Sequence, residues 1–183
     1  ISACLVGSEM CIRDRHITRY VMDVVLADLP EMLKARPGFH VSLNLSPQDL
    51  VADGPVQYLQ RRFSAMEMPP GALMLEVTER GLVDIEAARP ALQAARQIGA
   101  SIALDDFGTG YSSLSMLESI DIDTLKIDRI FIASIGAQAA ISPVTTHIIE
   151  MAHMLKLALI AEGVETQDLS LIHISEPTRQ AEI

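Results

Sequence analysis

The most informative segment of this chain is LDDFGTGYSSL, residues 104–114. An apolar run ends here in two adjacent carboxylates, Asp105 and Asp106, and a Gly-Thr-Gly loop follows them. Because neighbouring carboxylates repel each other, their usual reason to coexist is a bound cation. The glycines allow the backbone to turn sharply or to approach a ligand closely. The segment therefore indicates a metal-dependent site at the carboxyl end of a strand.

Hydrophobic periodicity around this segment predicts helices that alternate with strands. Strands are expected over residues 39–46, 73–78, 101–106, 124–128 and 157–162. Helices are expected over residues 16–33, 56–66, 85–98, 112–118 and 144–156. Pro30 marks a kink or an end in the first helix. Alternation of this kind implies parallel βαβ units in a single α/β domain.

The polar residues at the strand ends favour a barrel over an open doubly wound sheet. Several strands supply the active site at one face of a (β/α) barrel, whereas an open sheet binds its ligands around a switch point. All five predicted strands end in polar side chains. A complete barrel needs about 200–250 residues, and five strands do not close one. We therefore expect a partial (β/α)₈ TIM-type barrel, with about five of the eight strands present.

Both ends of the chain differ in character from the middle. Residues 1–15 and 169–183 interrupt the periodic pattern and resemble translated sequencing adapter, so we expect non-native tails there and a partial domain over residues 16–168. Cys4 and Cys11 both fall in the first tail and carry no functional meaning on this interpretation. The expected compartment is the cytoplasm, although other domains of the parent protein are free to tether it to a membrane.

The composition argues against two classes of partner. The net charge of −10 disfavours a surface for nucleic-acid polymers, which requires a basic patch. No apolar run approaches about 20 residues, so the sequence predicts no membrane segment. A phosphate-containing ligand is compatible with this acidity, because bound divalent cations invert the local field.

Five strand-end residues form the candidate metal site, namely Asn44, Glu76, Asp105, Asp106 and Glu162. Their carboxylate and amide oxygens are hard ligands suited to Mg²⁺ or Mn²⁺. If they converge, they can hold two cations about 4 Å apart, which activate a water and stabilise an in-line phosphoryl displacement. Asp105 is then the natural bridging ligand, and Lys126 is placed to orient the water or to offset phosphate charge. The alternative is that such strand-end acids cap helices or lie solvated in loops.

Five short stretches occur in the order found in one known family. They are NLS at 44–46, LEVTER at 75–80, LDDFGTGYSSL at 104–114, LKIDR at 125–129 and AEGVET at 161–166. Through them the chain closely resembles the EAL-domain family of cyclic di-GMP phosphodiesterases. The resemblance implies a (β/α)₈-type barrel in which one strand runs against the others. It also implies hydrolysis of one phosphodiester bond of cyclic di-GMP, which gives linear pGpG.

The resemblance further implies roles for individual residues. Asn44, Glu76 and Asp105 resemble ligands of a first metal, and Asp105, Asp106 and Glu162 resemble ligands or water contacts at a second. Lys126 then lies near the attacking water, and Glu162 is also a candidate general base. Three more residues are implied to anchor the loop at 107–113 or to lie at the edge of the site, namely Glu79, Glu165 and Asp128. The parent protein is implied to be a homodimer that uses Mg²⁺ or Mn²⁺.

Two family motifs are not found in this sequence. The Glu-Ala-Leu motif of the first strand, whose glutamate is a metal ligand, belongs before residues 16–33. The glutamine-glycine motif of the last strand belongs after residues 161–166. We therefore expect the parent protein to be a competent phosphodiesterase and the chain as given to be inactive.

Two other functions stay open at this point. One is a non-catalytic EAL module that binds cyclic di-GMP or a protein without cleavage, which in this family usually accompanies lost metal ligands. The other is an unrelated barrel lyase or isomerase with a carboxylate-bound Mg²⁺ and Lys126 as its base. The second alternative assigns no role to the Gly-Thr-Gly-Tyr-Ser-Ser loop.

Overall fold

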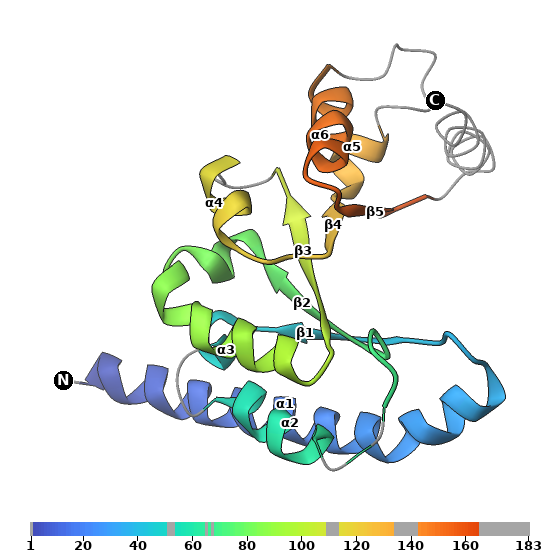
Figure 1. The fold of residues 1–183 in the computed structure, drawn as a ribbon. Coiled ribbons are helices and arrows are strands. Elements are labelled where there is room, and N and C mark those ends of the chain that lie inside the picture. Colours follow the sequence, from blue (N-terminus) through green and yellow to red (C-terminus); the bar gives the residue numbers. More distant parts are fainter. Residues whose placement is uncertain are drawn as a thin grey trace.

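The computed structural model describes residues 2–50, 54–64, 66, 68–108, 114–133 and 143–164, with side chains from residue 16 onward except at 114, 115, 118 and 133. Its centre is a parallel sheet of five strands in the order β1-β2-β3-β4-β5 (Figure 1). The strands are Val41–Leu45 (β1), Leu73–Thr78 (β2), Ser101–Phe107 (β3), Thr124–Ile127 (β4) and Ala158–Ala161 (β5). The parallel arrangement expected from the sequence is confirmed.

Helices connect the strands. The α-helices are Ser2–Ala35 (α1), Pro55–Phe63 (α2), Ile85–Gln97 (α3), Leu114–Ser119 (α4), Arg129–Ala133 (α5) and Pro143–Met154 (α6), and the 3-10 helices are Pro47–Leu50 (η1) and Glu79–Leu82 (η2). At the start of α3, the Asp84 side chain accepts a hydrogen bond from the N–H of Ala87. Gly99 follows the end of α3 at a left-handed φ of 77°. Within the described ranges, no helix is long and apolar enough to cross a membrane.

The first helix differs most from its prediction. It begins at Ser2 rather than at residue 16, and it passes through Pro30 to end at Ala35. Pro30 removes one hydrogen bond to the preceding turn. However, Leu29 is buried before the proline and Leu33 packs against the core after it. Because packing supplies most of the stability of a helix, burial on both sides of Pro30 outweighs the lost bond.

Smaller differences lie at other helix ends. Helix α2 ends at Phe63, three residues before its predicted end at 66. Helix α6 ends at Met154, and Lys156 takes a left-handed φ of 58° that turns the chain toward β5. A residue in this conformation closes a helix, so the prediction that α6 continues to residue 156 is wrong.

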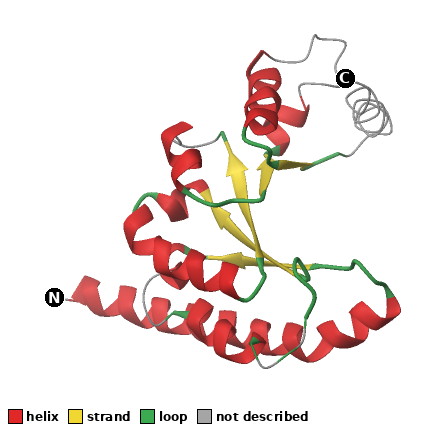
Figure 2. Ribbon diagram, viewed as in Figure 1, coloured by secondary structure: helices red, strands yellow, loops and turns green. Residues whose placement is uncertain are grey.

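The hydrophobic core lies on one face of the sheet. Successive side chains of a strand point to opposite faces of the sheet. Apolar residues of the strands form one hydrophobic cluster with residues of all six α-helices. The buried strand residues of this cluster are Leu43, Leu45, Leu73, Leu75, Val77, Ile102, Leu104, Leu125 and Ile127. Helices α1, α2 and α3 lie side by side along this face (Figure 2). The opposite face carries the polar strand residues and therefore the candidate site.

Candidate metal site

The predicted strand-end residues lie along the carboxyl edge of the sheet. Asn44 and Glu76 are register partners on β1 and β2. Asp105 lies near the end of β3. Glu162 follows β5, where its backbone N–H donates to the carbonyl of Ile127 (3.0 Å). Because in-register residues of parallel strands share a face, Asn44 and Glu76 point to the face opposite the helices.

Lys126 on β4 joins three of these carboxylates. Its Nζ lies 2.7 Å from Glu76 Oε2, 3.1 Å from Asp105 Oδ1 and 2.7 Å from Glu162 Oε1. The side chains of Lys126 and Glu76 are only 10% and 8% exposed, so water screens these ion pairs weakly. One ammonium thus holds together carboxylates from β2, from β3 and from the end of β5.

The surroundings of Lys126 keep its side chain charged. Burial lowers the pKa of the ammonium, but hydrogen bonds to Glu162, Glu76 and Asp105 raise the pKa by more, and it lies above its usual value. An amine that keeps its proton is a poor general base near neutral pH. The arrangement therefore gives no support to a lyase or isomerase in which Lys126 is the base.

A bulge in β3 brings Asp106 to the same place as Asp105. On a regular strand, two consecutive side chains point to opposite faces. Here the register with β4 shifts between Leu104 and Phe107, and Asp106 takes a left-handed φ of 55°. Such an extra residue re-aims a side chain. As a result, ligand oxygens of Asp105, Asp106 and Glu162 all lie within 4.8 Å of one another.

This carboxylate group fits a divalent cation. The pKa of Asp106 is raised, first by burial and then by the charges of Asp105, Asp128 and Glu162. Burial accounts for the largest part of this rise in pKa, and repulsion between the neighbouring carboxylates adds to it. Lys126 offsets only one of the negative charges. Clustered carboxylate oxygens with surplus negative charge are the ligands that Mg²⁺ and Mn²⁺ take in proteins.

The remaining predicted residues lie near this group or outside the described residues. Asn44 is exposed on the face of the site. Glu79 is buried in η2, directly after β2. Asp128 follows β4 and accepts a hydrogen bond (2.7 Å) from a backbone N–H of α5. Glu165 falls outside the described residues, as does most of the loop at 107–113 that Glu79 is expected to anchor.

Sequence reasoning missed two features of the site. The first is the set of three ion pairs made by Lys126. A signal for it exists, because Lys126 alternates with Leu125 and Ile127 and so shares the polar face of the sheet. The second is helix α5, which lies beside the site. Its five residues, Arg129–Ala133, are too few for a periodic pattern to reveal them.

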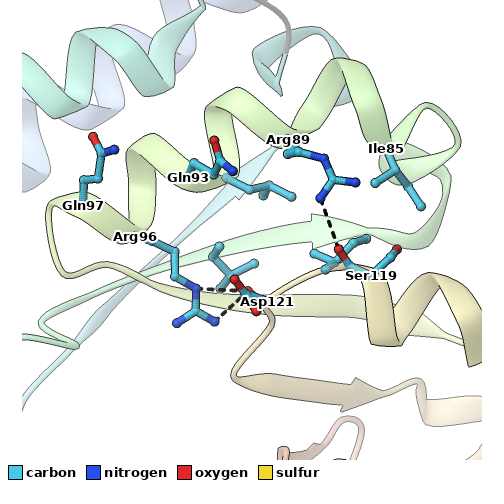
Figure 3. A pocket seen from close by; sticks show the side chains of 10 residues that line it. Ile85, Arg89, Gln93, Arg96, Gln97, Ser119 and Asp121 are labelled. Carbon is cyan, nitrogen blue, oxygen red and sulfur yellow. Dashed lines mark hydrogen bonds between the residues drawn. The ribbon is translucent and has the colours of Figure 1, made fainter.

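A hollow of about 410 Å³ lies away from these carboxylates, between α3 and the chain that follows α4 (Figure 3). Arg96 donates two hydrogen bonds to the carbonyl of Asp121 (2.6 and 3.1 Å), and Arg89 donates one to the carbonyl of Ser119 (3.5 Å). Both arginines therefore fasten α3 to the chain before β4. Ile102, from the apolar face of β3, lines the hollow. The hollow therefore lies on the opposite side of the sheet from the carboxylates.

Comparison with known proteins agrees with this geometry. Residues 10–170 match the EAL domain. The chain belongs to the EAL-domain family. This EAL domain is 39% identical over 150 residues to a protein of Escherichia coli (strain K12) named "Probable cyclic di-GMP phosphodiesterase PdeB", a match that covers 82% of the chain and 28% of that protein. The chain thus spans less than a third of the length of such relatives.

Solved structures share the fold of this EAL domain. The EAL domain of Mycobacterium smegmatis DcpA is 38% identical with a TM-score of 0.75, and the match covers 85% of this chain and 71% of that chain. A structure described as "PaMucR Phosphodiesterase, c-di-GMP complex" is 30% identical with a TM-score of 0.78, and the match covers 90% of this chain and 72% of that one. The expectation of a partial barrel of the EAL type is confirmed.

Proposed function

We propose that the intact protein carrying this EAL domain hydrolyses one phosphodiester bond of cyclic di-GMP to give linear pGpG, with two divalent cations. The observation that carries the proposal is the convergence of Asp105, Asp106 and Glu162 within 4.8 Å at the carboxyl edge of the sheet. Relatives named as cyclic di-GMP phosphodiesterases support the same chemistry. The proposal extends to the intact protein because the chain spans only part of those relatives.

Each side chain of the site has a role in this proposal. The first cation is assigned to Asn44, Glu76 and Asp105, and the second to Asp105, Asp106 and Glu162. Cations bound there would polarise the phosphate and lower the pKa of a water molecule. Lys126, held by its three ion pairs, orients that water or offsets charge that develops on the phosphate. Glu162, with 34% of its side chain exposed, is placed to accept the proton of the water.

The same proposal covers the metal, the bounds of the domain and the assembly of the protein. The cation is Mg²⁺ or Mn²⁺, both of which take oxygen ligands. The domain core comprises residues 16–168, and Glu79, Glu165 and Asp128 support the loop and the edge of the site. The intact protein acts in the cytoplasm as a homodimer.

The test removes one carboxylate that both cations share. We expect Asp105→Asn in the intact protein to lower kcat for cyclic di-GMP about 100-fold or more, since even contacts outside the ligand set commonly matter 10-fold or more. Product formation measured by chromatography with added Mn²⁺ gives kcat, and calorimetry gives the affinity for Mn²⁺. Asp28→Asn is the matched control, because Asp28 is exposed on α1, which packs against the opposite face of the sheet from the site.

Two results would count against the proposal. One is the absence of hydrolysis by the unaltered intact protein with either metal. The other is equal turnover by the unaltered protein and by Asp105→Asn. Binding of cyclic di-GMP in calorimetry without any turnover would favour the non-catalytic module instead.

A further inference from the structure

Helix α5 lies against both backbone segments that follow carboxylates of the site, and contacts with its own neighbours hold it in place. Asp128 accepts a hydrogen bond from the N–H of Ile130 (2.7 Å) at the start of the helix. Thr145 Oγ1 of α6 donates to the carbonyl of Phe131 (3.3 Å). Ile132 is buried in the core at 5% exposure. A helix this short has little stability alone, so these contacts determine where it lies.

Phe131 occupies the space beside Gly108, which follows Asp106 by two residues. A Cβ atom on Gly108 would lie 2.7 Å from Cε2 and 2.8 Å from Cζ of the Phe131 ring. Carbon atoms pack at about 3.5–4.0 Å, so no larger residue fits without movement of the ring. Gly108 also has a left-handed φ of 95°, which favours glycine. The ring therefore limits where the backbone runs after the carboxylate pair.

Arg129 makes the corresponding approach to Gly163, which follows Glu162 directly. A Cβ atom on Gly163 would lie 2.5 Å from Cβ and 3.4 Å from Cα of Arg129. Gly163 has a left-handed φ of 70°. The contact is made by the backbone end of Arg129, so it depends on the position of α5 and little on the guanidinium group.

We propose that Phe131 and Arg129 are positioning residues for the metal site, because they fix the backbone next to the carboxylates of β3 and of β5. Helix α5 then sets the separation between ligands that come from two strands. Contacts outside a ligand set play this part at many metal sites. The inference rests on the proposed function, since it assumes that these carboxylates bind cations.

The ion pairs of Lys126 do not make this role redundant. A lysine side chain has a flexible four-carbon stem, so its ammonium can follow carboxylates that move. Contact between an aromatic ring and a backbone is short-ranged and does not follow such movement. The ion pairs attract the carboxylates to Lys126, whereas α5 fixes the positions of the backbone segments that carry them.

Alanine substitutions at glycines test the contacts, because the chain offers matched controls. Gly108→Ala is paired with Gly38→Ala, and Gly163→Ala with Gly71→Ala. The control glycines have left-handed φ values of 84° and 78°, but a Cβ on either would meet nothing within 4 Å. Each control therefore carries similar backbone strain without the contact. We expect Gly108→Ala and Gly163→Ala to weaken Mn²⁺ binding about 10-fold or more, and the controls to change it about twofold or less.

Second substitutions in α5 should relieve these losses. Phe131→Leu makes room beside an alanine at position 108, and Arg129→Gly removes the Cβ that faces position 163. Each is expected to recover part of the Mn²⁺ affinity. Phe131→Ala alone introduces no clash and should weaken Mn²⁺ binding about 10-fold, whereas Phe39→Ala, a partly buried control before β1, should not. This comparison stands even if the glycine variants fail to fold.

Calorimetry of Mn²⁺ binding to the intact protein without nucleotide is the measurement, with circular dichroism to confirm folding. Equal affinities within each glycine pair, or unchanged affinity in Phe131→Ala, would overturn the positioning role. Asp105→Asn separates this failure from a failure of the proposed function. If Asp105→Asn also leaves Mn²⁺ binding unchanged, the metal site itself is wrong. If only Asp105→Asn weakens binding, the metal site stands and the role of α5 is wrong.

Discussion

Lys126 supplies, from within the chain, part of the positive charge that the carboxylates require. Its Nζ lies 2.7 to 3.1 Å from oxygens of Glu76 on β2, Asp105 on β3 and Glu162 directly after β5. Gathering such groups away from water without a cation costs on the order of several kcal/mol per ion. The lysine therefore allows the carboxylates to assemble before a metal binds, so that a metal completes the site and need not create it.

Replacing this lysine by methionine keeps an unbranched side chain, shorter by one heavy atom, and removes its charge. We expect Lys126→Met to lower the free energy of unfolding of the metal-free protein by about 3–5 kcal/mol, because it leaves buried carboxylates such as Glu76 unpaired. Added Mn²⁺ should recover part of the loss, since the cation replaces the missing charge. Urea unfolding with and without Mn²⁺, followed by circular dichroism, measures both effects.

Lys34→Met is the matched control for this prediction. The Lys34 and Glu31 side chains are 72% and 76% exposed, although the distance from Nζ to Oε1 is also 2.7 Å. Exposed pairs of this kind contribute about 0.5 kcal/mol or less. If Lys126→Met and Lys34→Met lowered the free energy of unfolding equally, burial would add nothing to the stabilisation by the ion pairs of Lys126.

At the scale of the strand, the bulge in β3 decides what Asp106 can do. We expect Asp106→Val to be less stable than Asp106→Gly by about 1–2 kcal/mol, because glycine accepts a left-handed φ and a β-branched residue does not. Both changes remove the carboxylate, so both should weaken Mn²⁺ binding to a similar degree. Urea unfolding and calorimetry together measure the two effects. Equal stability of the two variants would mean that the left-handed conformation at position 106 is not retained.

Regular elements of this chain are readable from its sequence, and backbone irregularities are not. The bounds of β2, Leu73–Thr78, agree with the prediction because an apolar run lies between turn residues. The bulge at Asp105 and Asp106 has no local signal, since adjacent residues on a regular strand would point apart. Pro30 does not end α1, because burial beyond the proline carries the helix onward.

In the candidate site, too, some features can be predicted from the sequence and others cannot. The meeting of Glu76, Asp105 and Glu162 follows from topology, because the carboxyl ends of parallel strands lie at one edge of a sheet. The approach of Phe131 to Gly108 does not follow from topology. This approach depends on the position of α5 in the folded protein, which no sequence pattern predicts.

At the scale of the whole molecule, the described sheet has two edge strands. Strands β1 and β5 each pair with one neighbour. Strand β5 is also poorly covered, with Ala158 exposed and the other three residues half-buried. Unpaired backbone groups at such edges pair readily with other chains. The net charge of −10 opposes association but does not occupy the edges.

The 183-residue chain by itself should therefore associate. We expect light scattering to rise with protein concentration, and Ala158→Lys on β5 to slow the rise, because lysine on an edge strand opposes pairing. Ala35→Lys adds the same charge at the exposed end of α1 and should leave the rate unchanged. Sharp, cooperative melting of a soluble monomer would contradict the prediction.

The strand order also bears on how the protein forms during synthesis. Paired residues of neighbouring strands are separated by as few as 20 positions, from Phe107 to Ile127, and by up to 34, from Thr124 to Ala158. A ribosome adds about 5–20 residues per second, so each new strand meets a partner that left the ribosome seconds earlier. The ion pairs of Lys126 then assemble in the order of translation. Glu162 arrives last, and with it the group of three carboxylates is complete.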